Sequence, residues 1–501
     1  MYEISTIENF GAVDADNDDL LLQVFEGHEA FEAVLAHSRY LITGRKGSGK
    51  TAIYKKLLSR DQAQTFVYGH TFSDYPWHYH DAQARAGIPD YDKFTHSWKY
   101  LIYLSLAKII LNQDQSLPHN DRSMECMAPI ERFVVDTYGS RDPDLTQIFT
   151  PTKEMRLNPY FQIDVKALKA GVSPERVPIK ELPTVVQDVN KNLQHLILSS
   201  VNEDNEYLVA FDQLDLGYDP KNDDYKNRLI GLLLACRDIN TAAREAGVKV
   251  FIAIFLRDDI YNSLHFEDKN KITENFACLI EWDTPRTERT LKDLMEKRFT
   301  LRLGEKNEKI TWGNIFDEDQ EMTGRQSKYN HITDRTYLRP RDAIKFCNLI
   351  LSQYKRRIKN ETCDEGKIDN VDINNARHGY SEYFLKELDD EIHKHLPGYE
   401  RYLEVVKAIG AWQFDKETFM SKWSDQGLDD DNQAPLEVLR QLFEFSVLGF
   451  YRPGGGGYGG SEYVFKYKDP GAQFDATATR FRVHPGLIEV LGLKRTNVID
   501  S

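Results

Sequence analysis

The chain has 501 residues, a formal net charge of −15 and 41% hydrophobic residues, which predicts about two to four well-packed domains rather than a disordered chain. The acidic balance argues against a protein that adheres broadly to nucleic acid, although a local basic surface stays compatible with it. The five cysteines are scattered without a Cys-x-x-Cys pair, a pattern that suits reduced thiols and shows no zinc signature.

The N-terminus carries no basic segment followed by an apolar core, so no signal peptide is expected. No run approaches the roughly 20 apolar residues that a membrane span needs. The sequence therefore predicts a soluble, cytoplasmic protein without membrane contact. Residues 1–37 form a predicted lead-in, in which Asp18 or Asp19 could cap a short helix.

A glycine-rich loop follows the lead-in. An apolar run at residues 40–43 predicts a strand, residues 44–51 spell Gly-Arg-Lys-Gly-Ser-Gly-Lys-Thr, and residues 52–58 begin a predicted helix. This order predicts a phosphate-binding P-loop. Lys50 would reach the β- and γ-phosphates of ATP, and the Thr51 hydroxyl would bind Mg²⁺. The expected nucleotide-binding residues are Gly44, Arg45, Lys46, Gly47, Ser48, Gly49, Lys50, Thr51 and Ala52.

A second strand is predicted at residues 65–69, and a helical insertion at about 72–205. Helical spacing of apolar residues predicts helices at 93–111 and 182–201, whereas the proline-punctuated stretch 113–180 is interpreted as loops and short helices. Residues 77–81, Trp-His-Tyr-His-Asp, resemble a metal-ligand cluster. Because no third ligand can be assigned, a packed aromatic turn is the preferred interpretation.

A second nucleotide motif lies at residues 207–215. Its apolar run predicts a strand buried in a parallel sheet, and Asp212 at the carboxyl end is the expected Walker B aspartate, which holds Mg²⁺ through water. Two candidates remain for orienting the attacking water: Asp215 by polarising it, or Gln213 by hydrogen bonding. Either would support slow hydrolysis.

A predicted helix at 225–246 leads to a β-branched run at 248–256, which predicts a central strand. Arg257 at its tip could touch the γ-phosphate as a sensor of hydrolysis. The alternative is a structural ion pair with Asp258 or Glu274. Residues 277–282 are expected to complete the sheet, so that the ATPase core spans 38–285.

Residues 286–360 are predicted to form a helical lid, with a helix at 290–299 and another that starts near Pro340. Arg339 or Arg341 at that start could reach the nucleotide. The basic tail at 355–359 complements a helix C-terminus more readily than it contacts DNA.

Residues 361–501 predict a winged-helix-like domain. Helical segments at 381–394, 400–409, 416–422 and 436–445 precede two strands, at 447–451 and 463–467, around a glycine loop, which is a hairpin signal. Residues 480–491 would add a last strand and a short helix. The glycine tract is not a second phosphate loop, because no Lys-Ser/Thr pair follows it. Winged helices bind DNA or protein, and the fold alone does not decide which.

Together, residues 44–51, 212–215, 255–257, 339–342 and the wing resemble those of a family of bacterial P-loop ATPases related to origin-recognition-type AAA+ proteins and STAND switch ATPases. The resemblance implies an α/β core with five strands and the P-loop strand near the centre, a helical lid, and nucleotide-dependent assembly into a homo-oligomer. Such ATPases often occur in anti-phage defence operons, which implies an effector protein as partner. Gln213 departs from the usual Asp-Glu pair.

Three hypotheses follow. The leading one is an ATP- and Mg²⁺-dependent switch or motor subunit of a defence complex. The second is a DNA-binding loader or regulator that uses the winged helix. The third, a small-molecule kinase, is disfavoured by the large insertion and the C-terminal domain.

Overall fold

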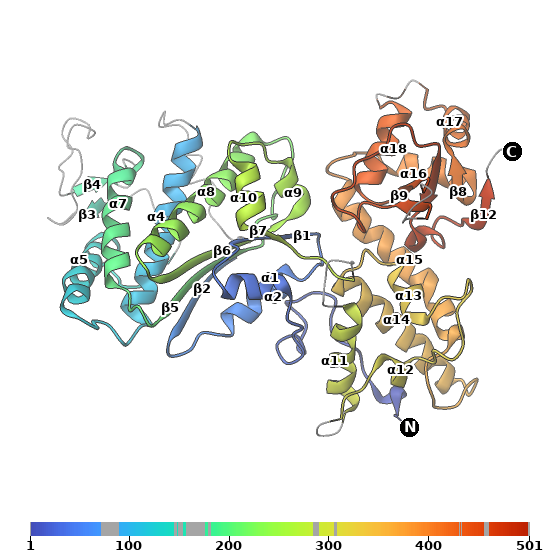
Figure 1. The fold of residues 1–501 in the computed structure, drawn as a ribbon, viewed down its shortest axis with the longest axis horizontal. Coiled ribbons are helices and arrows are strands. Elements are labelled where there is room, and N and C mark those ends of the chain that lie inside the picture. The colour runs from blue at the N-terminus through green and yellow to red at the C-terminus, as the bar shows by residue number, and fades with distance from the viewer. Residues whose placement is uncertain are drawn as a thin grey trace. The chain divides into compact units, whose positions relative to one another are not determined.

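The computed structural model describes residues 2–71, 90–144, 148, 154–156, 176–178, 182–283, 290–304, 308–429, 431, 433–454 and 460–498. The chain divides into two compact units (Figure 1). The core unit comprises Gly27–Arg45 and Lys50–Ile280. The C-terminal unit comprises Met1–Glu26, Lys46–Gly49 and Glu281–Ser501, and so includes part of the glycine loop. Each unit is described by itself.

The core unit is built on a five-stranded sheet in which every strand pair is parallel. In order across the sheet, the strands are β2 (Thr65–Thr71), β5 (Glu206–Asp212), β6 (Lys249–Arg257), β1 (Leu41–Gly44) and β7 (Ala277–Leu279). The apolar runs of β1, β5 and β6 are buried almost throughout, as expected for strands covered on both faces. The predicted α/β class with a parallel sheet is therefore confirmed, with β6 at the centre of the sheet and the loop-bearing β1 next to it.

Helices lie on both sides of this sheet, with α2 (Lys50–Leu58) on one side and α8 (Asp223–Glu245) on the other (Figure 1). The short helices near the sheet are α1 (Glu29–Leu35), α9 (Asp258–Ser263) and α10 (Lys269–Phe276). The helices predicted at 93–111, 182–201 and 225–246 correspond to α4 (Asp90–Asn112), α7 (Leu182–Ser200) and α8. α4 packs against both α7 and α8.

The stretch 113–180 differs from the expectation of loops and short helices. It contains α5 (Asp121–Tyr138), whose N-cap Asn120 accepts a hydrogen bond from the Ser123 N–H, and a short antiparallel pair, β3 (Glu154–Arg156) and β4 (Arg176–Pro178). Pro129 lies inside α5 and is buried. A proline costs a helix interior about 3 kcal/mol, and the packing of α5 on α7 offsets that cost. Residues 77–81, the weighed metal cluster, lie outside the described residues.

Asp18 does not cap a helix, so that prediction is wrong. The first α-helix, α1, starts later and is capped by His28, whose Nδ1 accepts from the Ala30 N–H. Asp18 instead forms an ion pair of 2.6 Å with Arg298, and both side chains are only 3% exposed. The carboxylate serves both a distant cation and the local backbone, since its Oδ2 accepts from Arg298 on α11 (Leu291–Leu303) and its Oδ1 accepts from the Ala12 and Leu20 N–H groups.

The C-terminal unit begins with helices that pack on one another. They are η1 (Ile4–Thr6), α11, α12 (Trp312–Ile315), α13 (Lys328–Thr333), α14 (Pro340–Lys359) and α15 (Asn370–Ile392). α14 runs along α15, and α11 packs on α14. Pro340 stands in the first turn of α14, as predicted.

The remaining residues form the winged-helix-like domain expected from the sequence. Its elements are α16 (Glu400–Ile409), β8 (Ala411–Asp415), α17 (Lys416–Asp425), α18 (Pro435–Glu444), β9 (Leu448–Arg452), β10 (Glu462–Val464), β11 (Arg480–Val483), η4 (Pro485–Leu487) and β12 (Lys494–Val498). The sheet order is β10-β9-β11-β8-β12, and β9 pairs with β10 as the predicted antiparallel hairpin. β8 and β12 were not predicted. Among the described helices, none is long and apolar enough to cross a membrane.

Candidate functional site

The carboxyl ends of three strands meet at one edge of the core sheet. The register places Gly44 of β1 opposite Arg257 of β6, and Phe211 of β5 opposite Ile254 of β6. Asp212 follows Phe211 at the end of β5. Open α/β sheets bind ligands at this edge. The structure therefore brings Gly44, Asp212 and Arg257, predicted from separate parts of the sequence, to the same edge.

The loop between β1 and α2 depends on glycine. Gly47 and Gly49 have φ values of +80° and +110°, in the left-handed region that side chains rarely adopt. A Cβ at Gly47 would also approach the side chain of Arg341 to 3.0 Å. The turn delivers the chain into α2 at Lys50, so the unpaired N–H groups of the first helical turn follow the loop directly, at Thr51 and Ala52.

The ammonium group of Lys50 contacts the first residues of the glycine loop. Its Nζ donates to the Gly44 carbonyl at 2.8 Å and to the Arg45 carbonyl at 2.9 Å. Burial lowers the pKa of Lys50, while the charges of Asp215 and other carboxylates at the sheet edge act in the opposite direction. The loop thus places a cation among acidic groups, where phosphate oxygens would replace its carbonyl partners.

Asp212 has the features of a cation ligand. It is 2% exposed, the Thr51 hydroxyl donates a hydrogen bond to its carboxylate, and its Oδ2 atom is buried without a partner among the described residues. Burial raises the pKa of Asp212 to about 6. A carboxylate oxygen beside a hydroxyl is the donor set that Mg²⁺ prefers when phosphates and waters supply its other ligands. The residues present therefore fit Mg²⁺.

Binding of ATP with Mg²⁺ is expected to weaken as the pH falls through about 6, because Mg²⁺ requires the ionised form of Asp212. Below that pH, proton competition costs about tenfold in affinity per pH unit. The pKa of Asp212 in the folded protein lies above the ordinary value of 3.8. The free energy of unfolding of the ligand-free protein should therefore decrease as the pH rises from about 4 to about 6.

The measurement is a titration with a fluorescent ATP analogue between pH 5 and pH 8, with and without Mg²⁺. Asp212→Asn is the matched control, since it keeps the shape of the side chain and removes the titrating group. An identical pH profile in Asp212→Asn, after correction for titration of the nucleotide itself, would contradict the assignment.

The two candidates for orienting the attacking water lie on the turn that follows β5. Gln213 has a φ of +59°, a backbone conformation that costs a non-glycine residue about 1–3 kcal/mol and often marks functional sites. The backbone N–H of Gln213 donates a hydrogen bond to the Asp212 carboxylate. Asp215 lies 3.5 Å from the Arg257 guanidinium. Both residues stay candidates.

Arg257 forms ion pairs with Asp259 and Asp215, two partners that were not predicted from the sequence. Its Nε and Nη2 donate to Asp259 at 3.0 and 2.6 Å, and its Nη1 donates to Asp215 at 3.5 Å. The Arg-x-Asp spacing at the junction of β6 and α9 is the sequence signal that could have identified Asp259. A sensor role for Arg257 stays a prediction, and the pair with Asp215 connects it to the turn after Asp212.

In the C-terminal unit, Arg339 holds the glycine loop. Its Nη1 donates to the Lys46 carbonyl at 2.7 Å and to Glu391 at 2.5 Å, while Nε and Nη2 both donate to Asp342 at 2.9 Å. The side chain is 1% exposed. All its nitrogens therefore have protein partners, and its predicted contact with the nucleotide stays a prediction.

Arg341 and Lys46 are held by carboxylates of α15 that were not predicted. Arg341 Nη1 donates to Glu387 at 3.1 Å, and its Nε donates to the Val13 carbonyl at 3.2 Å. Lys46 forms ion pairs with Asp390 and, at 3.7 Å, with Glu387. In addition, the Trp282 indole N–H donates to the carbonyl of Ser48 at 2.9 Å. None of these partners is close to the loop in sequence, so no local pattern could reveal them.

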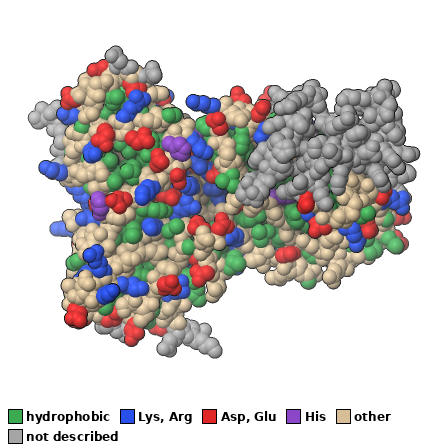
Figure 2. Space-filling view, turned by 180° about the vertical axis from the view of Figure 1, so that it is seen from behind, with side chains coloured by type: hydrophobic (Ala, Val, Ile, Leu, Met, Phe, Trp, Pro, Cys, Tyr) green, Lys and Arg blue, Asp and Glu red, His purple; other side chains and the backbone are tan. Residues whose placement is uncertain are grey.

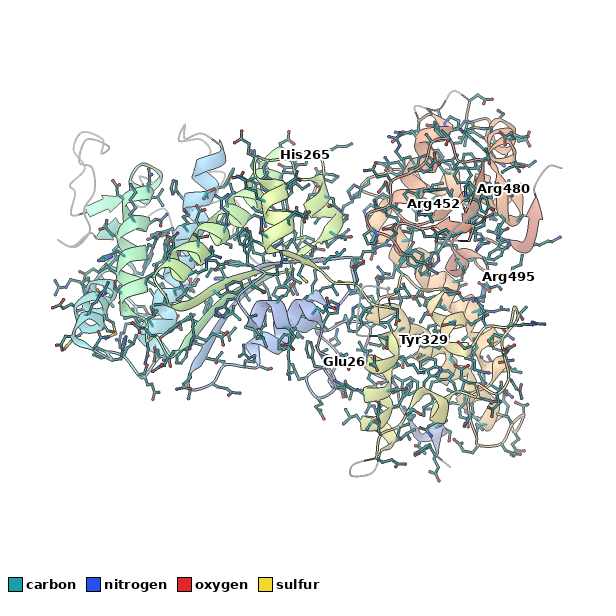
Figure 3. All side chains as sticks on the ribbon, viewed as in Figure 1. Glu26, His265, Tyr329, Arg452, Arg480 and Arg495 are labelled. Carbon is teal, nitrogen blue, oxygen red and sulfur yellow. The ribbon has the colours of Figure 1, made fainter. Side chains whose placement is uncertain are left out.

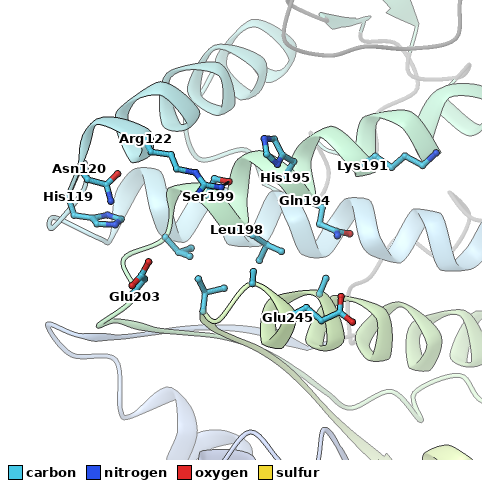
Figure 4. Close-up of a pocket in the computed structure, with 14 residues that line it drawn as sticks. His119, Asn120, Arg122, Lys191, Gln194, His195, Leu198, Ser199, Glu203 and Glu245 are labelled. Carbon is cyan, nitrogen blue, oxygen red and sulfur yellow. Dashed lines mark hydrogen bonds between the residues drawn. The ribbon is translucent and has the colours of Figure 1, made fainter.

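A pocket of about 470 Å³ lies elsewhere in the core unit, among α5, α7 and α8 (Figure 4). Its lining mixes cations such as Arg122 and Lys191 with acids such as Glu203 and Glu245. No predicted site residue lines it. Within the described part of the chain, no group of three or more His, Cys, Asp or Glu side chains could hold a metal ion by itself.

Comparison with known proteins gives limited matches. A family profile described as the FunZ-associated C-terminal helical domain matches residues 289–389, which is about a fifth of the chain. No curated protein matches. A Walker-type ATPase of Pyrococcus abyssi aligns over 96% of this chain and 97% of its own, with 10% identity and a TM-score of 0.34. Cdc6p of Pyrobaculum aerophilum aligns over 95% and 96%, with 11% identity and a TM-score of 0.30.

Both superpositions are loose, so the fold class rests on the chain's own geometry. A parallel sheet, one strand inserted between the loop-bearing β1 and the Asp212-bearing β5, and a glycine loop that enters a helix at Lys50 together define an α/β P-loop NTPase fold. The profile match falls on α11 to α15, the helical part of the C-terminal unit.

Proposed function

We propose that the protein binds ATP with Mg²⁺, hydrolyses it slowly, and serves as a switch or motor subunit of a larger complex. The observation that carries the proposal is the buried Asp212 carboxylate, which has one unpartnered oxygen and is hydrogen-bonded to Thr51, the residue after Lys50 in the glycine loop. Mg²⁺ would supply the positive charge that faces the Asp212 carboxylate, and a nucleotide phosphate would supply the negative charge that faces Lys50.

Each residue has a defined part in the proposed reaction. The loop N–H groups and Lys50 bind the phosphates, and Thr51 and Asp212 hold Mg²⁺. The cation supplies charge neutralisation at the phosphate oxygens when it is bound. Gln213 or Asp215 orients the water, and Arg257, fixed by Asp259, stabilises the charge that develops during transfer.

The proposed switch acts through Lys46. This loop residue is joined to α15 by ion pairs with Glu387 and Asp390, and its carbonyl is bound by Arg339 from the start of α14. A phosphate that draws the loop N–H groups inward would pull on these contacts, so that nucleotide state biases the position of the helical segment. Assembly as a homo-oligomer with an effector chain in an anti-phage defence complex is part of the proposal, motivated by the family resemblance of the motifs.

The test combines phosphate release with a mass measurement. Purified protein should release phosphate from ATP without an added acceptor, and its mass should increase in ATP with Mg²⁺ relative to protein in EDTA. Hydrolysis with unchanged mass would overturn the assembly part alone. Turnover that requires an added small-molecule acceptor would favour a kinase instead.

A second candidate function, a DNA-binding loader or regulator, is favoured by one observation. The sheet of the winged-helix-like domain carries more cationic than acidic side chains, in contrast to the chain as a whole. Figure 2 shows basic and acidic side chains interspersed on the face of the molecule that it draws.

A further inference from the structure

The C-terminal sheet concentrates positive charge. Its five strands contain five cationic side chains and only two acidic ones, Asp415 and Glu462. Asp415 is engaged as the N-cap of α17, where it accepts from the Thr418 N–H. The remaining chain is strongly acidic, so this sheet is an electrostatic exception. The cationic residues are Arg452, Arg480, Arg482, Lys494 and Arg495.

Aromatic rings alternate with these arginines. Arg482 lies over the Tyr463 ring at 3.8 Å and over the Trp412 ring at 4.8 Å from their centroids. Arg480 lies 5.6 Å from the Tyr451 centroid, and Arg495 lies 5.5 Å from that of Trp412. Together, these arginine–aromatic pairs include residues from all five strands of the sheet. We call this set the arginine–aromatic sheet.

The strand register places several of these side chains on one face. Tyr463 pairs with Tyr451, and Arg482 pairs with Gly449, two residues before Tyr451. Arg480 is two residues before Arg482, so it shares their face because side chains alternate along a strand. Four spacings between neighbouring strands give the sheet a width of about 19 Å.

The charges are available to a ligand. Arg480 and Arg495, labelled in Figure 3, are exposed, and the rings of Tyr451, Tyr463 and Trp412 are half-buried. Arg452 is also exposed, but it pairs with Glu462 at 3.4 Å and directly follows Tyr451 in β9, so it lies on the opposite face. Within the part of the chain that the structure describes, Arg480 and Arg495 form no ion pair. Cation–π contacts hold such guanidinium groups in place without neutralising them.

A second observation points to an anion beside this sheet. Arg335 is 1% exposed, its Nη1 donates to the His331 carbonyl at 2.9 Å, and its Nε and Nη2 are buried without a partner among the residues that the structure describes. An arginine cannot relieve its charge by losing a proton. Burial, with Arg377 and Arg495 nearby, lowers the pKa of His331 to about 4, so Arg495 of the sheet lies close enough to His331, the hydrogen-bond partner of Arg335, to act on its charge.

We infer that the arginine–aromatic sheet binds single-stranded nucleic acid, with its phosphates on Arg480, Arg482 and Arg495 and its bases against Tyr451 and Tyr463. Arginines interleaved with accessible rings suit a strand whose bases are unstacked, because a duplex keeps its base faces hidden. Duplex recognition by a winged helix would instead place a helix in the groove. This inference goes beyond the ATP-dependent switch and does not depend on it.

The test uses the full chain without nucleotide and a labelled thymine oligonucleotide of about 20 nucleotides, followed by fluorescence anisotropy. A matched uridine RNA identifies which nucleic acid is preferred. Three phosphate contacts on a single strand predict that raising salt from about 50 to about 200 mM weakens binding about 20-fold. Arg480→Ala combined with Arg495→Ala should reduce the slope of log affinity against log salt by about two thirds.

Substitution of Tyr451 tests the contribution of base stacking to binding separately from the contribution of the positive charges. Tyr451→Ala should weaken binding on the order of tenfold with an unchanged salt slope, and Tyr451→Phe should retain affinity. Lys407→Ala is the matched control, because Lys407 is an exposed lysine of α16 that pairs with Glu404 in the same domain. It should bind like the unmodified protein.

Three outcomes would overturn the inference: no binding at about 50 mM salt, tighter binding of a duplex than of the single strand, or an equal loss in Lys407→Ala. Thermal melting of each variant shows whether a loss reflects unfolding. Lys50→Ala should bind the oligonucleotide normally, so failure of the ATPase proposal and failure of this one are distinguishable.

Discussion

Replacing Lys50 with alanine is expected to reduce ATP turnover by on the order of 100-fold or more, because it removes the one side-chain cation that the glycine loop directs at the phosphates. In the ligand-free protein the Nζ group is held by the carbonyls of Gly44 and Arg45 at 2.8 and 2.9 Å. ATP phosphates would compete for the same donor. Phosphate release under saturating ATP and Mg²⁺, together with nucleotide affinity, measures the effect.

Lys56→Ala is the matched control, since Lys56 lies in the last turn of the same helix, α2. It should hydrolyse ATP at the unmodified rate. Turnover in Lys50→Ala equal to that of the unmodified protein would reject the assignment of the loop. Circular dichroism of both variants shows whether loss of the two carbonyl contacts has altered the fold.

Arg339→Ala is expected to lower the free energy of unfolding of the C-terminal unit by about 3–5 kcal/mol, because removal of one partner leaves buried charges without compensation. Arg339 is buried against Asp342 and Glu391, whose side chains are 0% and 7% exposed. The neighbouring carboxylates raise the pKa of Arg339 despite its burial, so the guanidinium stays charged. Denaturant unfolding followed by tryptophan fluorescence measures the loss.

Two further variants test whether the loss of stability comes from the buried contacts of Arg339. Arg339→Lys should recover only part of the stability, since an ammonium group cannot donate two parallel hydrogen bonds to Asp342 and still reach the Lys46 carbonyl. Arg440→Ala, which breaks an exposed pair with Glu437 on α18, should leave unfolding unchanged. An Arg339→Ala protein as stable as the Arg440→Ala protein would show that the buried network does not hold the helical segment together.

The two predictions concern different parts of one loop. Lys50 belongs to the core unit, whereas Lys46, whose carbonyl Arg339 binds, belongs to the C-terminal unit. If the proposed switch is correct, Arg339→Ala should also alter the response of the protein mass to ATP. Lys50→Ala should abolish that response without destabilising the C-terminal unit.

Local patterns in the sequence determined a large part of the fold. The apolar run before Asp212, the glycine loop before Lys50 and the helix at 400–409 all have the predicted type and place, because each is set by residues close together in the chain. The sheet edge then follows, since parallel strands bring the ends of β1, β5 and β6 together. The pattern could not predict α5, where burial of one helix face outweighs an internal proline.

Only the tertiary structure decided which charges meet. Arg257 pairs with Asp215, Asp18 pairs with Arg298, and Lys46 pairs with Asp390, more than 300 residues away. The short strands β8 and β12, which join Trp412 and Arg495 to the arginine–aromatic sheet, also depend on distant pairing. A local sequence pattern specifies backbone conformation and burial through nearest neighbours. The partner of a charged side chain is set by chain folding over long separations, and so it leaves no local signal.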